Sequence, residues 1–192
     1  MTHIERKLRE KEEIRKSIID AAIGIAAKEG WHTVTIRKIA DAIEYTPPIV
    51  YEYFESKEDL IKEIIYMGFD ILTVGIENAR KNEISPKKFL ELMSISQWDF
   101  ASEHKEIYQL MFSLERPVPN DKMIEKIQMI KEYFIEIANG NKEFAMEYQA
   151  NWICLMQGAI STMMILEMPP EFNNIDKRQL YIRMIHRFLD HI

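Results

Sequence analysis

The chain has 192 residues, which is long enough for one or two domains with a sizeable hydrophobic core. Its formal net charge of −6 argues against a broad basic surface for nonspecific binding of nucleic acid. The single cysteine, Cys154, excludes an intrachain disulfide and is typical of a protein in a reducing cytoplasm.

The first predicted helix carries an apolar stripe and ends near Gly30, a residue type that often follows a helix. A signal peptide is the alternative interpretation of residues 17–27, because an apolar run follows a charged start. Asp20 interrupts that run, and acidic residues are mixed with the basic ones before it, so a helix of a folded domain is favoured. The stripe consists of Ile14, Ile18, Ala22, Ile25 and Ala26.

Residues 35–57 indicate two short helices joined by a tight turn. Thr35 is placed to cap the first helix, whose apolar residues fall at helical spacing. The turn is expected at Glu44 and Tyr45, and Thr46 is placed to cap the second helix. Two helices at a steep angle across a short turn are typical of a module that places the second helix in the major groove of DNA.

The second helix begins with Pro47 and Pro48, at positions where a missing N–H group removes no intrahelical hydrogen bond. Ser56 and Asp59 are spaced as a capping box for a third, longer helix over residues 57–80. The pattern therefore predicts a helix-turn-helix followed directly by a long helix.

In this stretch the sequence resembles the TetR family of bacterial transcription regulators. The family's pattern contains Ile-Ala, a serine, and then Leu-Tyr-x-Tyr-Phe-x-x-Lys-x-x-Leu. This chain matches it with Ile39-Ala40, Thr46 in place of the serine, Val50 in place of the leucine, Tyr51, Tyr53-Phe54, Lys57 and Leu60. The resemblance implies a three-helix DNA-binding domain over residues 1–62 and a helical ligand-binding and dimerisation domain over residues 63–192.

The resemblance also implies which residues face DNA. The alternative for the threonines is that they only cap helices, and the alternative for the cations is that they are ordinary solvent-exposed side chains. Residues 1–38 hold nine Lys or Arg against six Asp or Glu, and residues 39–63 hold two against seven, so contact must depend on a few placed cations. Glu44 stands where relatives carry Gly in the turn. The expected DNA-binding residues are Thr35, Arg37, Thr46, Pro47, Pro48, Ile49, Tyr51, Tyr53 and Lys57.

Two of these expectations have their own physical reason. Tyr51 and Tyr53 are two residues apart on a helix and cannot share one face, so at least one of them should point outward and offer its hydroxyl to a phosphate. The apolar second helix, with Pro47, Pro48 and Ile49, cannot donate hydrogen bonds to guanine but can pack against thymine methyl groups.

The remaining elements are also predicted to be helical, and no alternating apolar run predicts a strand. The expected fold is therefore all-α. Residues 148–166 carry no charge, but their polar residues favour a helix buried on all sides in protein over a membrane span, with Cys154 as a small buried hydrophobe. The predicted helices cover residues 86–102, 106–113, 121–138, 143–167 and 176–191.

Aromatic and methionine side chains are spread over several of these helices and suit an adaptable pocket for apolar ligands. Filling of an ordinary core is the alternative interpretation of each. The residues expected to bind the ligand are Trp98, Met111, Phe112, Trp152 and Met156.

The last two predicted helices are apolar on more than one face, Ile160 and Phe188 included, which predicts a homodimer with a four-helix interface about a two-fold axis. No catalytic, cofactor or metal motif is found: Glu29 and His32 show the spacing of a helical di-iron site only once. We expect a cytoplasmic repressor that a small apolar or amphipathic ligand releases from a palindromic operator. The alternatives are an activator, a ligand-independent regulator or a helical enzyme.

Overall fold

The computed structural model describes residues 3–80, 85–113, 119–165 and 175–192. Every element of regular secondary structure in these ranges is helical, which confirms the all-α fold class. No helix among the described residues is long and apolar enough to cross a membrane.

The N-terminal helices follow the predicted order closely. They are α1 (His3–Glu29), a 3-10 turn η1 (Trp31–Thr33), α2 (Ile36–Ala42), α3 (Pro47–Tyr51) and α4 (Lys57–Arg80). Gly30 ends α1 with a φ of 84°, a left-handed conformation that glycine adopts without steric cost. The sequence did not predict η1. The expected domain boundary after residue 62 falls inside α4, which continues through it without a break.

The second half consists of α5 (Pro86–Glu103), α6 (Lys105–Met111), α7 (Asp121–Ile137), α8 (Lys142–Ile160) and α9 (Lys177–Asp190). Four of them start at a side chain that accepts a backbone N–H hydrogen bond, namely Ser85, Asn120, Asn141 and Asp176. The predicted helix 143–167 ends differently, because α8 passes into a π-helical segment η2 (Ser161–Ile165).

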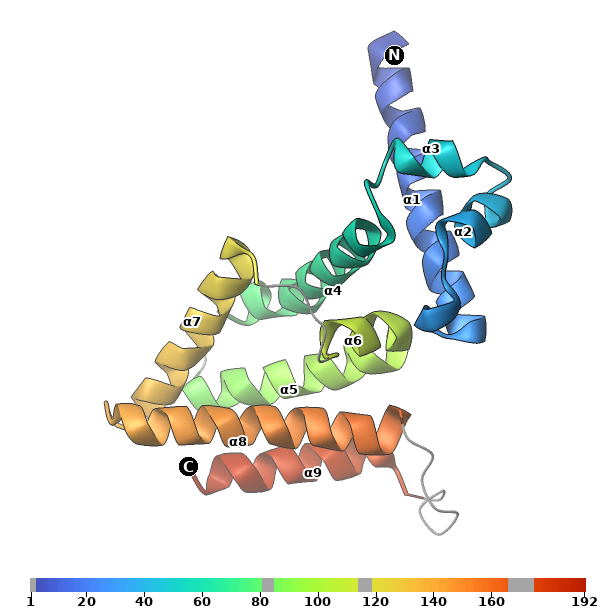
Figure 1. The fold of residues 1–192 in the computed structure, drawn as a ribbon. Coiled ribbons are helices and arrows are strands. Elements are labelled where there is room, and N and C mark those ends of the chain that lie inside the picture. The colour runs from blue at the N-terminus through green and yellow to red at the C-terminus, as the bar shows by residue number, and fades with distance from the viewer. Residues whose placement is uncertain (1–2, 81–84, 114–118, 166–174) are drawn as a thin grey trace.

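Figure 1 shows the arrangement of these helices. Helices α1, α2 and α3 form a head at one end, and the N-terminal part of α1 projects beyond it. Helices α5, α8 and α9 lie side by side at the other end, and α7 packs on α5 and α8. The head is joined to this base by α4, which packs on both α5 and α6.

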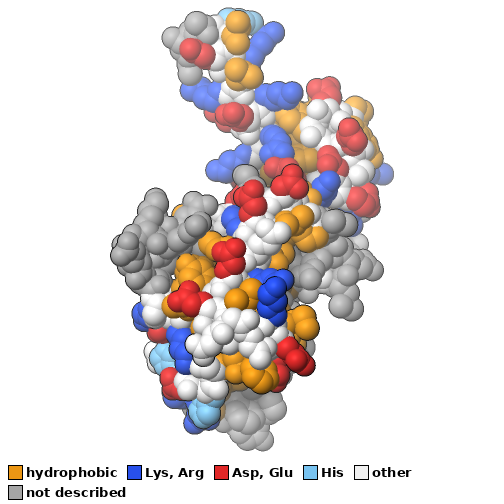
Figure 2. Space-filling view, turned by 90° about the vertical axis from the view of Figure 1, so that its left-hand side faces the viewer, with side chains coloured by type: hydrophobic (Ala, Val, Ile, Leu, Met, Phe, Trp, Pro, Cys, Tyr) orange, Lys and Arg blue, Asp and Glu red, His pale blue; other side chains and the backbone are white. Residues whose placement is uncertain are grey.

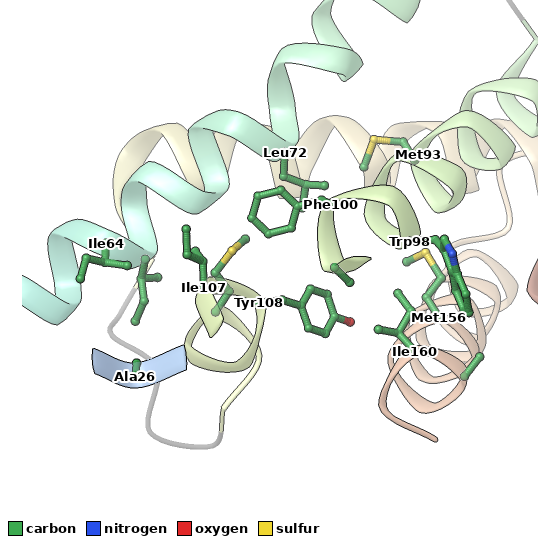
Figure 3. Packing of buried hydrophobic residues seen from close by; sticks show 14 of the residues in the cluster. Ala26, Ile64, Leu72, Met93, Trp98, Phe100, Ile107, Tyr108, Met156 and Ile160 are labelled. Atoms are coloured by element: carbon green, nitrogen blue, oxygen red, sulfur yellow. The ribbon is translucent and has the colours of Figure 1, made fainter. Parts of the chain in front are cut away.

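One hydrophobic core runs through both parts. Figure 3 shows Ala26 of α1 and Ile64 of α4 on one side of this core, and Trp98 and Met156 on the other. Ile160 is also fully buried within the chain, so the prediction that it belongs to a dimer interface was wrong.

The face of α8 around Cys154 corrects two further predictions. Cys154 is exposed, and so are Ala150 and Gly158 one turn to either side. The predicted helix is therefore not buried on all sides in the single chain. The error has a physical cause: an uncharged run shows only that a helix can be buried, and not which element covers each face.

Candidate functional site: the head and a cavity beside α4

The helix-turn-helix is held by local hydrogen bonds and a few buried side chains. The Thr35 hydroxyl oxygen accepts a hydrogen bond from the Lys38 N–H at 3.2 Å, as predicted. Ile39 and Val50 are fully buried and fix α2 and α3 to the head. The Tyr45 N–H closes the turn by donating to the Ala40 carbonyl at 2.9 Å.

The start of α3 agrees with the prediction in part. Pro47 and Pro48 occupy its first two positions, and Thr46 has the extended backbone of a capping residue. Its side chain makes no capping hydrogen bond, so the predicted hydroxyl cap was wrong. Because the Thr46 side chain is exposed and does not serve the helix, its hydroxyl is available to another partner.

The capping box of α4 is shifted by one residue. The Ser56 hydroxyl oxygen accepts a hydrogen bond from the Asp59 N–H at 3.1 Å, as the motif predicts. The Asp59 carboxylate accepts from the Glu55 N–H at 3.3 Å instead of from that of Ser56. The carboxylate still lies in the first turn of α4, where it complements the positive end of the helix dipole.

The structure brings all nine expected DNA-binding residues to the surface of the head or its edge. Tyr51 is 54% exposed while Tyr53 packs against the core, which confirms that the two tyrosines face different sides. The exposed set consists of Thr35, Arg37, Thr46, Pro48 and Tyr51, and the half-buried set consists of Pro47, Ile49, Tyr53 and Lys57.

Tyr53 and Lys57 are both positioned as hydrogen-bond donors. Partial burial and the nearby Glu52 carboxylate raise the pKa of Tyr53, so its phenol keeps its proton. The Lys57 ammonium donates to the Trp31 carbonyl at 3.4 Å, which holds the side chain against η1.

Several cations of the head are held in ion pairs. Figure 2 shows basic and acidic side chains intermixed on the head and on the projecting part of α1. Lys38 binds Glu29 at 2.6 Å, and this hydrogen bond and ion pair lower the pKa of the Glu29 carboxyl. Arg6 and Arg9 pair with Glu10 and Glu13 along α1. Arg37, in contrast, takes part in no ion pair within the described ranges.

Tyr45 was not among the expected DNA-binding residues, yet it is 45% exposed in the turn before α3. Its position in the turn was visible in the sequence, but the direction of its side chain was not. Tyr45 precedes Thr46 in the chain, and its exposed side chain carries a hydroxyl that can donate to a phosphate.

A cavity of about 410 Å³ lies among α4, α5, α7 and α8. Phe112, Trp152 and Met156 line it, as expected. Trp98 and Met111 do not: the Trp98 ring packs against Tyr181 with centroids 4.8 Å apart, and Met111 is fully buried.

Sequence reasoning missed the contribution of α4 and α7 to this cavity. Phe69 and Thr73 are four residues apart on α4, and Met123 and Lys126 are three apart on α7, so each pair presents one face of its helix. The spacing was visible in the sequence, but the tertiary arrangement decides which face meets a cavity.

The α5 wall adds polar groups to a mostly apolar lining. Gln97 faces the cavity and donates to the Tyr108 hydroxyl at 3.3 Å. Burial raises the pKa of Tyr108 to about 12, so this phenol stays neutral.

The head and the fold both have counterparts among known proteins. Residues 18–64 match the model of "Bacterial regulatory proteins, tetR family". The transcriptional activator FasR of Mycolicibacterium smegmatis is 24% identical over 102 residues, which is 53% of this chain and 47% of FasR. The fatty acid metabolism regulator protein of Bacillus subtilis is 26% identical over 124 residues, 64% of this chain and 63% of that protein. The alignments thus span about half of FasR and less than two thirds of the Bacillus subtilis protein.

Solved structures share the fold over nearly the whole chain. A TetR-family transcriptional regulator from Bordetella parapertussis superposes with a TM-score of 0.68 at 19% identity, covering 93% of this chain and 95% of that one. FadR from Bacillus subtilis in complex with stearoyl-CoA superposes with a TM-score of 0.63 at 18% identity, covering 92% and 98%. Residues 18–64 thus carry the DNA-binding region of the tetR family of bacterial regulatory proteins, and the chain as a whole shares the fold of solved TetR-family regulators.

Proposed function

We propose that this chain is a cytoplasmic, homodimeric transcription regulator whose affinity for operator DNA depends on an amphipathic ligand in the cavity. One observation carries the proposal: α4 begins at Lys57, beside the exposed helix-turn-helix, and lines the cavity with Phe69 and Thr73 further along. A ligand that binds more tightly to one position of α4 than to another would favour that position, and the orientation of the head would change with it.

Binding to DNA would be dominated by contacts to phosphates. Helix α3 presents Pro47, Pro48 and Ile49, which offer no hydrogen-bond donor to a base edge. The donors are at the margins, on Tyr51, Tyr53 and Lys57, and they suit the sugar-phosphate backbone. Sequence preference would then come from thymine methyl contacts and from DNA shape.

The relatives suggest which ligands to test first. FadR was solved with stearoyl-CoA and AibR with isovaleryl-CoA and operator DNA, so acyl thioesters are reasonable probes. FasR is named an activator and KstR of Mycolicibacterium smegmatis, 30% identical over 81 residues, a repressor. We propose repression for this chain, with activation as the alternative. These curated relatives are all named as regulators, which gives the enzyme alternative no support.

A homodimer is supported by the free face of α8. Ala150, Cys154 and Gly158 recur every four residues on this face, and a Cβ built on Gly158 would meet nothing within 4 Å. Small residues let a second helix approach closely, and α8 with α9 from two chains would form a four-helix interface.

The test combines ligand binding with operator binding. The full-length chain is titrated onto DNA from upstream of its own coding region, with and without a compound that binds stoichiometrically. Trp152 lines the cavity and Trp98 does not, so quenching that persists in Trp98→Phe and is lost in Trp152→Phe reports cavity occupancy. We expect occupancy to weaken operator binding by about 5- to 150-fold, the usual range of allosteric coupling. Unchanged operator affinity at saturation with each such compound would contradict the ligand-responsive model.

A further inference from the structure

Lys126 of α7 is the only charged side chain among the described residues that line the cavity. The rest of the lining is apolar, except for Thr73 and a few glutamines. The Lys126 side chain is 22% exposed, so most of it is removed from solvent. A positive charge in such a wall is poorly hydrated and gains most from an anion brought to it.

The present partners of Lys126 stabilise its positive charge only in part. The ammonium donates to the Thr73 hydroxyl oxygen, a neutral acceptor. The Thr73 hydroxyl in turn donates to the Phe69 carbonyl at 2.7 Å, so the acceptor is fixed on α4. The charged partner is Asp70, whose carboxylate oxygen is 3.8 Å from the ammonium and whose side chain is 58% exposed. An ion pair at this distance and exposure leaves room for a closer anion.

We infer that the cavity binds an amphipathic anion, with its charged head at Lys126 and its apolar part along Phe69, Phe112, Trp152 and Met156. This inference rests on the proposed function, because it assigns the chemistry of the ligand to the same cavity. The shared chemistry is an alkyl or acyl chain with an anionic head. The head is either a free carboxylate or the phosphates of an acyl thioester.

The position of Lys126 also places the head of the ligand between α7 and α4. Lys126 is the link from α7 to Thr73 and Asp70, both of which belong to α4. A ligand anion competes with these two acceptors for the same ammonium. Binding of the ligand therefore replaces the contact of Lys126 with α4 by a contact of Lys126 with the ligand. Because α4 leads to the head, this exchange takes place beside the connection to the DNA-binding part.

The experiment compares probes that differ only in the head, on the full-length chain. Decanoate, 1-decanol and decanoyl-CoA are titrated below their micellar concentrations, with Trp152 fluorescence and calorimetry as readouts. We expect wild type to bind at least one of the two anions about tenfold or more tightly than the alcohol, the usual strength of a charge-assisted hydrogen bond. Tighter binding of decanoate identifies a free carboxylate, and tighter binding of decanoyl-CoA identifies a phosphorylated thioester.

Variants on α7 assign the preference to Lys126. Lys126→Met should remove the preference for the anion and leave binding of 1-decanol unchanged, whereas Lys126→Arg should retain it. Lys131→Met is the matched control, because Lys131 lies on the exposed side of the same helix and should not alter the preference. Equal binding of anion and alcohol by wild type, or an anion preference that survives in Lys126→Met, would overturn the inference.

Operator binding separates this inference from the proposed function. An anion preference that depends on Lys126, with no effect on operator affinity, supports the inference and contradicts ligand-responsive regulation. Binding of acid and alcohol with equal affinity, with loss of operator affinity for both, supports regulation and overturns the anionic head.

Discussion

At the scale of single residues, Glu44 stores backbone strain in the turn of the helix-turn-helix. Its φ is 61°, a left-handed conformation that costs a residue with a side chain about 1 kcal/mol relative to glycine. We predict that Glu44→Gly raises the free energy of unfolding by about that amount, in thermal or urea denaturation.

The control for this prediction is Glu44→Gln, which removes the charge and keeps the strained backbone. A gain in stability with Gly alone assigns the effect to φ. An equal gain with both variants would show that the charge of Glu44, beside the acidic residues of the head, is responsible.

Lys57 is the residue whose role in DNA binding is most directly testable. Its ammonium donates to the Trp31 carbonyl of η1, outside the helix α3 that is expected to read the bases. Lys57→Ala should weaken all operators about equally and reduce the slope of log K against log salt by about one unit. Lys62→Ala, exposed one turn further along α4, is the control and should change neither. A loss confined to one base position would contradict a phosphate contact.

At the scale of helices, α4 and α6 approach each other through Gly68. A Cβ at this position would lie 2.5 Å from the Met111 sulfur and 2.6 Å from the Ile107 Cγ2. Gly68→Ala should therefore destabilise the chain by about 1 to 3 kcal/mol, the usual cost of overpacking. Gly24→Ala is the matched control, since a Cβ there meets nothing within 4 Å and alanine favours a helix interior by about 0.5 to 1 kcal/mol. Denaturation midpoints that move in the same direction for both variants would contradict the close approach.

The positions of the helices could be predicted because their signals are local. Thr35 and Ser56 mark helix starts within three residues of sequence, and the structure shows both hydroxyls accepting the expected N–H groups. The lining of the cavity could not be predicted in the same way. Trp98 and Trp152 are the same residue type on amphipathic helices, yet one packs on Tyr181 and the other lines the cavity. That difference depends on how helices distant in sequence pack together.

At the scale of the whole molecule, the head meets the base directly at α6, in addition to the connection through α4. The Trp31 indole N–H of η1 donates to the Glu106 carbonyl of α6 at 2.9 Å. Phe112, which follows α6, contacts Phe69 of α4 with ring centroids 6.1 Å apart. Because Trp31 also holds Lys57 and Phe112 also lines the cavity, a change at the cavity has a short path to a residue expected to contact DNA.

The assembly can be tested at Cys154, on the free face of α8. Cys154 is exposed in the single chain, so Cys154→Arg should leave the fold of each chain intact. In a dimer with α8 at the interface, the same change buries an unpaired charge where two helices meet closely. We predict that Cys154→Arg is monomeric in sedimentation at micromolar concentrations at which wild type is dimeric. It should also lose binding to a palindromic operator, because a monomer meets only one half-site.

Ile124→Arg is the control for this last prediction. Ile124 is 42% exposed on α7, so the substitution adds the same charge to an apolar surface position away from the free face of α8. It should keep both the dimer and the affinity for the operator. A wild-type chain that sediments as a monomer would contradict the homodimer, and a Cys154→Arg variant that stays dimeric would show that the two-fold interface lies away from this face of α8.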